Sequence, residues 1–186
     1  RKHVEIAGLS HKIDFRLQDY REVEGQFDRI VSVEMIEAVG YENLQTYFKT
    51  LEGNLKEDGK IAIQVITVTD QKFENYVKDC DWIQKYIFPG ALCPSIGAIV
   101  ETMSKSSRLW IESTQNYGTH YARTLNEWRQ NFESNWDNVQ KLGFDQKFRR
   151  LWNYYMVYCE AGYRSGVLGL HQMVLSKSSR RLQVEY

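Results

Sequence analysis

The stretch FDRIVSVEMIEAVG, residues 27–40, decides the expected fold. After Phe27 and Asp28 its first half is almost continuously apolar, which is typical of a strand covered on both faces in a parallel sheet. Two acids, Glu34 and Glu37, follow among apolar neighbours. Ligands of open α/β sheets bind beyond the carboxyl ends of the strands. The stretch therefore predicts a buried strand that leads into a functional site.

The segments on either side indicate an α/β fold. KIDFRLQDY (12–20) alternates apolar and polar residues as a strand does, and IAIQVIT (61–67) predicts another buried strand. Apolar residues recur at helical spacing from Leu44 to Leu55, and KEDGK predicts a turn around Gly59. Strand, helix and strand in this order predict a right-handed crossover and a parallel sheet.

The rest of the chain is predicted to be mostly helical and to belong to the same domain, residues 1–186. Residues 70–95 hold both prolines and no strand pattern, which favours an inserted helical lid. The remaining predicted elements are a helix over 95–106, a strand over 108–117, two long aromatic helices within 120–166, a strand over 168–177 and a charged tail over 178–186.

The composition argues against several classes of partner. The 24 Lys and Arg residues balance the 24 Asp and Glu residues, so no overall field draws the chain to nucleic acid. No apolar run is long enough for a membrane-spanning helix. Cys80, Cys93 and Cys159 lack metal-ligand spacing, so we expect a reduced intracellular compartment and no metal site. The 12 Tyr, 8 Phe and 5 Trp indicate a large apolar interior, a lipid-sized pocket, or both.

Polar residues that follow the first two predicted strands should share one rim of the sheet. These residues are Gln18, Asp19, Glu34 and Glu37. An acid or amide there accepts the amine of an adenine or holds a small cation, although Asp19 also fits a solvated turn. Glu37, among apolar residues, must be paired or hydrogen-bonded to stay ionised, which favours a functional role.

Two residues further along the chain allow either a structural or a functional reading. Gln64, within an apolar strand, needs a hydrogen-bond partner and fits a core amide as well as a site residue. Tyr121 lies where a strand joins a long helix, so its hydroxyl points into a pocket or its ring is plain core. No GxGxxG motif occurs, so the usual glycine-rich cofactor turn is missing.

The chain resembles the cyclopropane-fatty-acyl-phospholipid synthase family, which includes the mycolic acid cyclopropane synthases. The segments that carry the resemblance are FDRIVSVEMIEAVG, YIFPGALCPS, YGTHYARTLNEWRQNF and FRRLWNYYMVYCEAGYRSGVLGLHQMVLSK. They span about residues 7–177. The resemblance implies an S-adenosylmethionine-dependent methyltransferase with a Rossmann-like sheet, from which the first two strands and the glycine loop are missing here. The implied reaction methylates a cis double bond in an unsaturated phospholipid acyl chain and closes a cyclopropane by loss of a proton.

The resemblance also implies a bicarbonate ion that accepts this proton. The implied bicarbonate site comprises Glu37, Tyr121, Gln64 and the backbone at Ile66, and the implied cofactor residues are Gln18 and Asp19, with Glu34 on the same rim. Glu37 should then be a partly protonated donor with a raised pKa. Many members of the family carry histidine at the position of Gln64. Glutamine can hydrogen-bond bicarbonate, but unlike histidine it cannot carry a proton.

The missing strands lead to further expectations. RKHVEIAGLS predicts the end of a helix stopped by Gly8, as in a chain that begins within a domain. The chain alone should bind S-adenosylmethionine poorly and be inactive. The open edge of the FDRIVSV strand should be covered by a partner chain, by strand exchange in a homodimer, or by the KIDFRLQ strand moving beside it. The resemblance further implies a cytoplasmic protein at the periphery of a membrane.

Two other functions stay open. A small-molecule N-methyltransferase shares the HYA motif, although YIFPG favours a lipid enzyme. A non-catalytic lipid-binding module fits the missing loop but not the presence of Glu37 and Tyr121. The segment 144–152 contacts lipid or forms an ordinary amphipathic helix whose aromatic side packs inward. Its basic and aromatic residues are Lys147, Arg149, Arg150, Phe144, Phe148 and Trp152.

Overall fold

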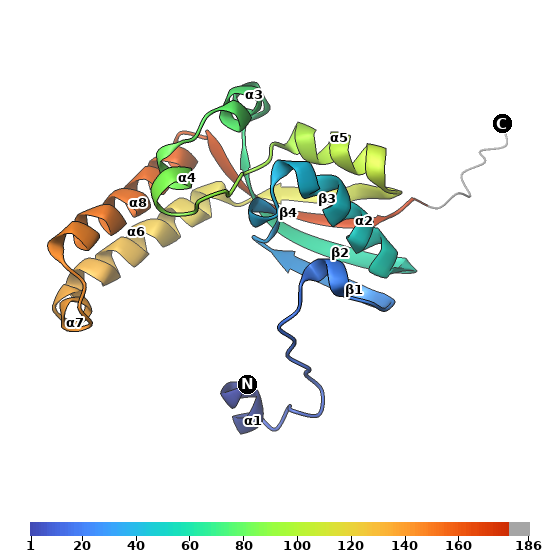
Figure 1. Ribbon diagram of the computed structural model, residues 1–186, viewed down its shortest axis with the longest axis horizontal. Helices are drawn as coiled ribbons and strands as arrows, with labels where there is room; N and C mark the ends of the chain where they lie inside the picture. Colours follow the sequence, from blue (N-terminus) through green and yellow to red (C-terminus); the bar gives the residue numbers. More distant parts are fainter. Residues whose placement is uncertain (179–186) are drawn as a thin grey trace.

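The computed structural model describes residues 1–178 and contains one four-stranded sheet (Figure 1). Most of the predicted tail, residues 179–186, lies outside the described residues. The strands are β1 (Phe27–Val33), β2 (Leu55–Val68), β3 (Leu109–Asn116) and β4 (Leu168–Lys177), in the order β1-β2-β4-β3. The α/β fold class is confirmed, and β4 matches its predicted bounds.

The prediction of a parallel sheet is confirmed for β1 and β2 and is wrong for β4. β1 and β2 are parallel, whereas β4 is antiparallel to both β2 and β3. After β3, helix α6 runs out from the sheet and α8 runs back to the end where β3 finished (Figure 1). The N–H of Tyr117 donates to the carbonyl of Leu170 at this end, so β4 must start beside the end of β3 and run against it.

The helices follow local sequence signals. The α-helices are α1 (Lys2–Ile6), α2 (Leu44–Asn54), α3 (Asp70–Lys78), α4 (Trp82–Tyr86), α5 (Ile96–Ser106), α6 (Gly118–Ser134), α7 (Trp136–Lys141) and α8 (Gln146–Arg164). The short 3₁₀ helices are η1 (Tyr20–Glu22), η2 (Ile36–Ala38) and η3 (Tyr41–Asn43). Ser95 and Asp145 accept hydrogen bonds from the first turns of α5 and α8, as N-cap residues do. The predicted stop of α1 is confirmed, since Gly8 has a φ of 67°.

The main core lies between the sheet and helices α2 and α5. Alternate residues of β2, including Ile61 and Val65, face this layer and are fully buried. Tyr47 and Phe48 of α2 are also fully buried, and their rings meet edge to face at 5.2 Å. The predicted turn around Gly59 before this strand is wrong, because β2 already begins at Leu55 and residues 56–59 form a bulge within it.

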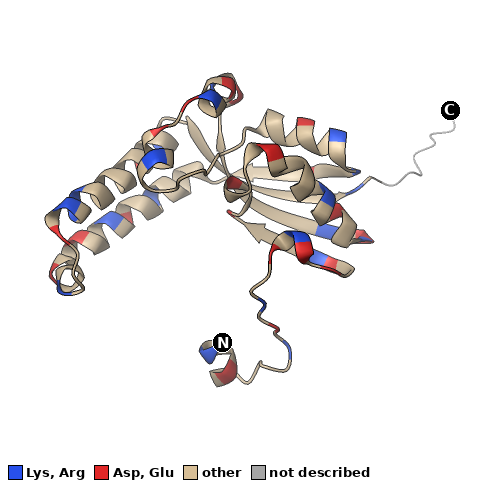
Figure 2. Cartoon of the chain, viewed as in Figure 1, with Lys and Arg blue, Asp and Glu red and all other residues tan. Residues whose placement is uncertain are grey.

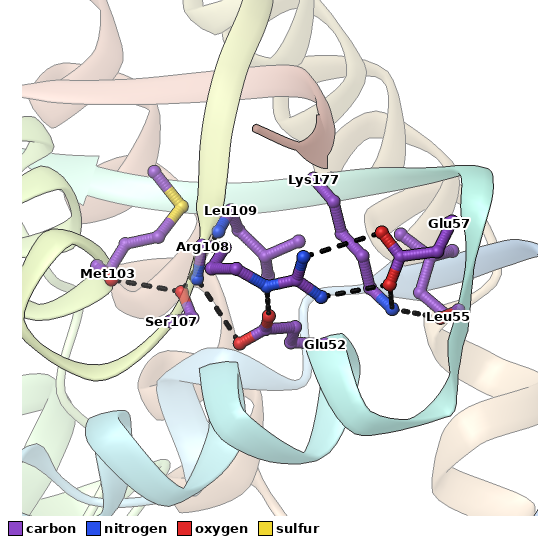
Figure 3. Close-up of polar contacts among 8 residues, drawn as sticks. All are labelled: Glu52, Leu55, Glu57, Met103, Ser107, Arg108, Leu109 and Lys177. Atoms are coloured by element: carbon purple, nitrogen blue, oxygen red, sulfur yellow. Dashed lines mark hydrogen bonds and ion pairs between the residues drawn. The ribbon is translucent and has the colours of Figure 1, made fainter. Parts of the chain in front are cut away.

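Arg108, just before β3, connects α2 to β2 through its side chain (Figure 3). Its Nε donates to Glu52 of α2 at 2.7 Å, and its Nη2 donates to Glu57 of β2 at 2.9 Å. Lys177 of β4 donates to the carbonyl of Leu55. One guanidinium therefore connects a helix to the strand that follows it.

Two predictions about the amino-terminal strands are wrong. Residues 12–20 form no strand, and Leu17 is fully exposed. An extended segment needs a neighbour for its backbone hydrogen bonds, and residues 12–20 pair with none of the four described strands, although the outer edge of β1 stays open. The predicted movement of this segment beside β1 is therefore not found. β1 is not covered on both faces either, because Val31 is 70% exposed and Val33 is 59% exposed.

Helices α6 and α8 form an antiparallel pair that extends beyond the sheet (Figure 1). Ala122 and Leu125 of α6 pack with Tyr163 of α8 and Leu170 of β4. The predicted lid segment, residues 70–95, holds α3 and α4 and lies across the near end of this pair. Among residues 1–178, none of the helices combines the length and the apolar character needed to cross a bilayer.

Candidate functional site

Glu37 occupies the position that β1 would take if the strand continued. β1 ends at Val33, and the N–H of Glu34 still donates to the carbonyl of Gln64 at 2.8 Å. The chain then turns, with Glu34 at a φ of 49°, a left-handed conformation that non-glycine residues seldom adopt. One turn later, the Oε1 of Glu37 accepts the N–H of Ile66 at 2.6 Å. A carboxyl group thus satisfies the next free amide of β2.

The carboxyl group of Glu37 is buried and only half satisfied. Its side chain lies on η2, where the residue is 7% exposed, and burial raises its pKa despite the hydrogen bond from Ile66. Its Oε2 has no hydrogen-bond partner among residues 1–178. The charge of Glu34 raises the pKa further. These features favour a protonated acid whose second oxygen is free to bond a small polar group.

A chain of two amides fixes Glu34. The Nε2 of Gln64 donates to Oε1 of Glu34 at 2.8 Å, and the Nε2 of Gln172 donates to Oε1 of Gln64 at 2.9 Å. The three residues come from the end of β1, from β2 and from β4. The structure thus gives Gln64 hydrogen-bond partners on both sides. The sequence did not lead to a prediction for Gln172. The signal was available, because Gln172, like Gln64, is a polar residue within an apolar strand.

Replacing Gln64 with leucine should destabilise the protein by about 1–2 kcal/mol, because Glu34 and Gln172 both lose their amide partner. Urea unfolding monitored by circular dichroism measures the change. Gln115→Leu on β3 is the matched control, since this glutamine is exposed, and its substitution should change stability by less than about 0.5 kcal/mol. Equal losses in both variants would contradict the role given to the amide chain.

Tyr121 lies in the first turns of α6, among other aromatic side chains. Its ring meets Tyr163 of α8 at 5.2 Å and Trp128 at 5.9 Å, both edge to face. Burial, followed by the charges of Glu34 and Glu37 and the nearby Cys159, raises the pKa of Tyr121 to about 12. The charges of both carboxyl groups therefore affect the phenol, whose surroundings exclude part of the water.

Further side chains from α8 complete this region. Burial is the main cause that raises the pKa of Tyr155, Tyr163 and Cys159, and the charge of Glu34 adds to it for both tyrosines. Tyr155 also meets Phe88 of the lid segment at 5.9 Å. The aromatic pattern noted in the sequence thus contributes rings to the site as well as to the core.

The lid segment is tied directly to Glu37. The N–H of Leu92 donates to the backbone carbonyl of Glu37 at 2.8 Å. Burial, with a contribution from Glu37, raises the pKa of the adjacent Cys93 to about 12, so this thiol stays protonated at neutral pH. The lid therefore contacts the backbone of the same residue whose carboxyl group reaches β2.

The predicted cofactor residues Gln18 and Asp19 lie apart from this arrangement. Gln18 donates to the carbonyl of Glu22, and Arg21 donates to both carboxylate oxygens of Asp19. These bonds from the Arg21 side chain and backbone lower the pKa of Asp19 to about 2. Among residues 1–178, no hydrogen bond or ion pair connects either residue to Glu34 or Glu37.

The part of the chain that the structure describes contains no cluster of three His, Cys, Asp or Glu side chains suited to a metal ion. The acids near the site bond to amides instead. Gln64 and Ile66 donate to Glu34 and Glu37, respectively.

The raised pKa of Glu37 makes stability depend on pH. A carboxyl group whose pKa is higher in the folded than in the unfolded state binds its proton more tightly when folded, so stability falls as pH rises from about 4.5 through the folded pKa. Glu37→Gln should remove this loss, and its stability relative to the wild type should rise by on the order of 1 kcal/mol between pH 4 and pH 8. Urea unfolding at both pH values tests this expectation.

Glu42→Gln provides the control for this measurement, because Glu42 is exposed. Its stability curve should run parallel to that of the wild type across the same pH range. A parallel curve for Glu37→Gln would show that the burial of Glu37 has no effect on its ionisation.

Comparison with known proteins identifies the relatives of this chain. The model of a family described as mycolic acid cyclopropane synthetase matches residues 1–173. Tuberculostearic acid methyltransferase of Mycobacterium tuberculosis is 44% identical over 175 residues, which is 94% of this chain and 41% of the relative. Cyclopropane-fatty-acyl-phospholipid synthase of Escherichia coli K12 is 36% identical over 161 residues, 87% of this chain and 40% of that protein. The chain thus spans less than half the length of these relatives.

Solved structures show the same fold. The cyclopropane synthase MmaA2 of Mycobacterium tuberculosis has a TM-score of 0.79 at 22% identity, covering 95% of this chain and 66% of that one. The mycolic acid cyclopropane synthase CmaA1, solved in complex with SAH and CTAB, has a TM-score of 0.78 at 23% identity, covering 92% and 65%. With the family match over residues 1–173, the chain belongs to the mycolic acid cyclopropane synthetase family.

Proposed function

We propose that this chain is part of an enzyme that transfers a methyl group from S-adenosylmethionine to the cis double bond of an unsaturated phospholipid acyl chain and closes a cyclopropane ring. Family membership supports the class of reaction. The observation that carries the proposal is the buried Glu37, with one oxygen held by Ile66 and the other unpartnered. The names of the relatives from Mycobacterium tuberculosis and Escherichia coli support a lipid acceptor.

The residues around Glu37 fit a small oxyanion such as bicarbonate. Burial raises the pKa of Glu37 and so favours its protonated form, which donates a hydrogen bond to an oxyanion that an ionised carboxylate would repel. The high pKa of Tyr121 keeps its hydroxyl proton available for the same purpose. When bound, bicarbonate supplies the base that accepts the proton lost on ring closure. The role of this chain is to hold that base in a region with little water.

Gln64 and Ile66 support Glu34 and Glu37 in this proposal. Ile66 fixes the orientation of the Glu37 carboxyl group through its backbone N–H, and Gln64 fixes Glu34. The single N–H of Ile66 would have to release Glu37 before it could donate to bicarbonate, whereas Gln64 keeps a second amide N–H. The arrangement therefore favours Glu37, Tyr121 and Gln64 as the direct ligands.

The proposed reaction passes through a carbocation, and the aromatic side chains around the site suit a positive charge. Methyl transfer breaks the S–CH₃ bond of the donor, releases S-adenosylhomocysteine, forms one C–C bond to the alkene and leaves a carbocation. Loss of a proton from the new methyl group to the base then lets a second C–C bond close the ring. The faces of aromatic rings attract cations, and rings here come from Tyr121, Tyr155 and Tyr163. Exclusion of water by the same rings protects the cation from hydration.

The methyl donor needs more than this chain provides. Gln18 and Asp19 lie on the exposed segment before β1, and Asp19 is held by Arg21. Gln18 keeps its amide oxygen available, which suits the amine of an adenine. The glycine-rich turn that brings a backbone close to such a cofactor is missing from the sequence. We therefore propose that the chain alone binds the donor poorly.

The outer edge of β1 is unpaired among residues 1–178, which favours the proposal that this strand pairs with another polypeptide. A hollow of about 430 Å³ runs along β1 and α2, and Val31, Val33 and Met35 line part of it. An exposed strand edge beside apolar side chains is normally paired in a stable protein. We propose that β1 pairs with a strand from another polypeptide, either a second copy of this chain or the part of the protein that the relatives possess beyond the match.

A methyl-transfer assay with the methyl donor and a lipid acceptor tests the proposed function. The chain is incubated with methyl-labelled S-adenosylmethionine and vesicles of cis-unsaturated phospholipid, with and without the unmatched part of the Mycobacterium tuberculosis relative added as a separate polypeptide. Mass spectrometry of the fatty acids should show the gain of one CH₂ group only in the complemented sample. Methylation of amines in a parallel panel would instead indicate a small-molecule N-methyltransferase. Lipid binding without methyl transfer in the complemented sample would overturn the proposed activity.

A further inference from the structure

A groove between α4 and α8 lies outside the site described above. It has a volume of about 540 Å³, and its lining comprises Trp82, Asp145, Lys147, Phe148, Arg150, Leu151 and Tyr154. Trp82 of α4 meets Tyr154 of α8 edge to face at 4.5 Å. Aromatic and aliphatic side chains therefore form the floor of the groove, and charged residues of the first turns of α8 form its rim.

Apolar side chains remain exposed around the groove. Tyr154 is 50% exposed, and the other exposed apolar residues of this side are Tyr86, Phe88, Leu142, Phe144, Val157 and Tyr158. They come from the lid segment, from the α7–α8 connection and from α8. Of these, the rings of Tyr86, Tyr154 and Tyr158 each meet Trp82. An exposed cluster of aromatic side chains marks an interaction site in a folded protein.

The basic residues of the groove are free to meet an anion. Lys147 and Arg150 are exposed, and neither forms an ion pair within residues 1–178. Arg149 differs, since it donates to Glu133 and lies 5.1 Å from the ring of Trp136. The carboxylate of Asp145 accepts the N–H of Phe148 as the cap of α8. Figure 2 shows blue segments near the start of α8, where these cations lie.

Different residues of α8 contribute to the packing of the protein and to the groove. The half-buried rings of Phe148 and Trp152 stack at 5.6 Å, so part of the aromatic pattern predicted for 144–152 serves packing. Tyr155 meets Phe88 of the lid segment and is affected by the charge of Glu34, whereas Tyr154 meets Trp82 in the groove. Neighbouring residues of α8 thus serve the site and the groove.

We propose that the α4–α8 groove docks the protein on a surface of anionic phospholipid. The cations at the rim complement lipid phosphates, while the apolar floor and the exposed aromatic residues enter the boundary between headgroups and acyl chains. The inference rests on the proposed function, because it supplies the contact through which a membrane-bound acyl chain becomes accessible. An anionic lipid surface is the occupant that both features favour together.

Sedimentation with vesicles tests the proposal on the purified chain. The chain should bind vesicles that contain phosphatidylglycerol more tightly than vesicles of phosphatidylcholine alone. The double variant Lys147→Glu/Arg150→Glu should weaken that binding by about 25-fold or more, since each cation near such a surface contributes about five-fold. Tyr154→Ala should weaken it several-fold without unfolding the chain, because half of this side chain is exposed.

The matched control is Lys2→Glu/Lys49→Glu, which changes the net charge equally on α1 and α2, far from the groove (Figure 1). It should bind vesicles like the wild type. Equal losses in both double variants, or wild-type chain that does not bind phosphatidylglycerol, would overturn the proposal. Capture of a protein instead of lipid through Tyr154 would overturn it as well. The assay needs neither S-adenosylmethionine nor Glu37, so its failure is distinguishable from failure of the proposed reaction.

Discussion

Replacing Glu37 with glutamine should lower kcat by about 100-fold or more in the complemented enzyme, while KM for the lipid changes little. Proton transfer to a positioned base contributes about 10² to 10⁴ in rate, and Glu37 is the residue proposed to hold that base. Glutamine still accepts the N–H of Ile66, so the local fold is preserved while the acidic proton of Glu37 is lost. Steady-state kinetics with methyl-labelled S-adenosylmethionine and unsaturated phospholipid vesicles measure the effect.

Two further variants sharpen this measurement. Tyr121→Phe should also lower kcat, because it removes the second proposed ligand of bicarbonate and keeps the ring in place. Glu42→Gln, an exposed change a few residues from Glu37, should leave kcat unaffected. Normal turnover by Glu37→Gln would refute the role given to the buried acid, even if methyl transfer itself takes place.

Phe48→Ala should destabilise the protein by about 3–5 kcal/mol, the largest effect we expect on stability. The ring of Phe48 is fully buried in the layer between α2 and the sheet, and its removal forfeits burial and leaves a void. Helix α2 also begins soon after the turn that carries Glu37, so a loosened α2 should disturb the site. Urea unfolding followed by circular dichroism gives the loss directly.

The control for this change is Val100→Ala on the outer side of α5. Val100 is 44% exposed, and alanine favours a helix, so stability should change by less than about 1 kcal/mol. A loss for Phe48→Ala no larger than that of the control would mean that the layer of α2 on the sheet is loosely packed.

Sequence reasoning succeeded where local pattern and burial agree. The bounds of β4 follow from its apolar run, and α2 follows from the helical spacing that begins at Leu44. It failed for residues 12–20, because alternation predicts the conformation of a strand but not the presence of a neighbour to pair with. It failed for β1 for a related reason, since an apolar strand exposes Val31 when nothing covers it.

The candidate site was predictable in part. An acid among apolar residues singled out Glu37, and a polar residue within a strand singled out Gln64. The bond from Ile66 to Glu37 depends on where β1 stops, which no local pattern specifies. The partnership of Gln64 with Gln172 depends on the antiparallel register of β4, which the expected parallel sheet did not contain. Tertiary pairing therefore decides details that composition and periodicity leave open.

The hydrogen bond from the N–H of Leu92 to the backbone carbonyl of Glu37 connects the lid segment to the residue that carries the buried acid. A displacement that carried Leu92 away would release the backbone of η2 at the residue whose carboxyl group is anchored to β2 by a single bond. In the proposed reaction, passage of a lipid tail past this segment would therefore affect the position of the acid.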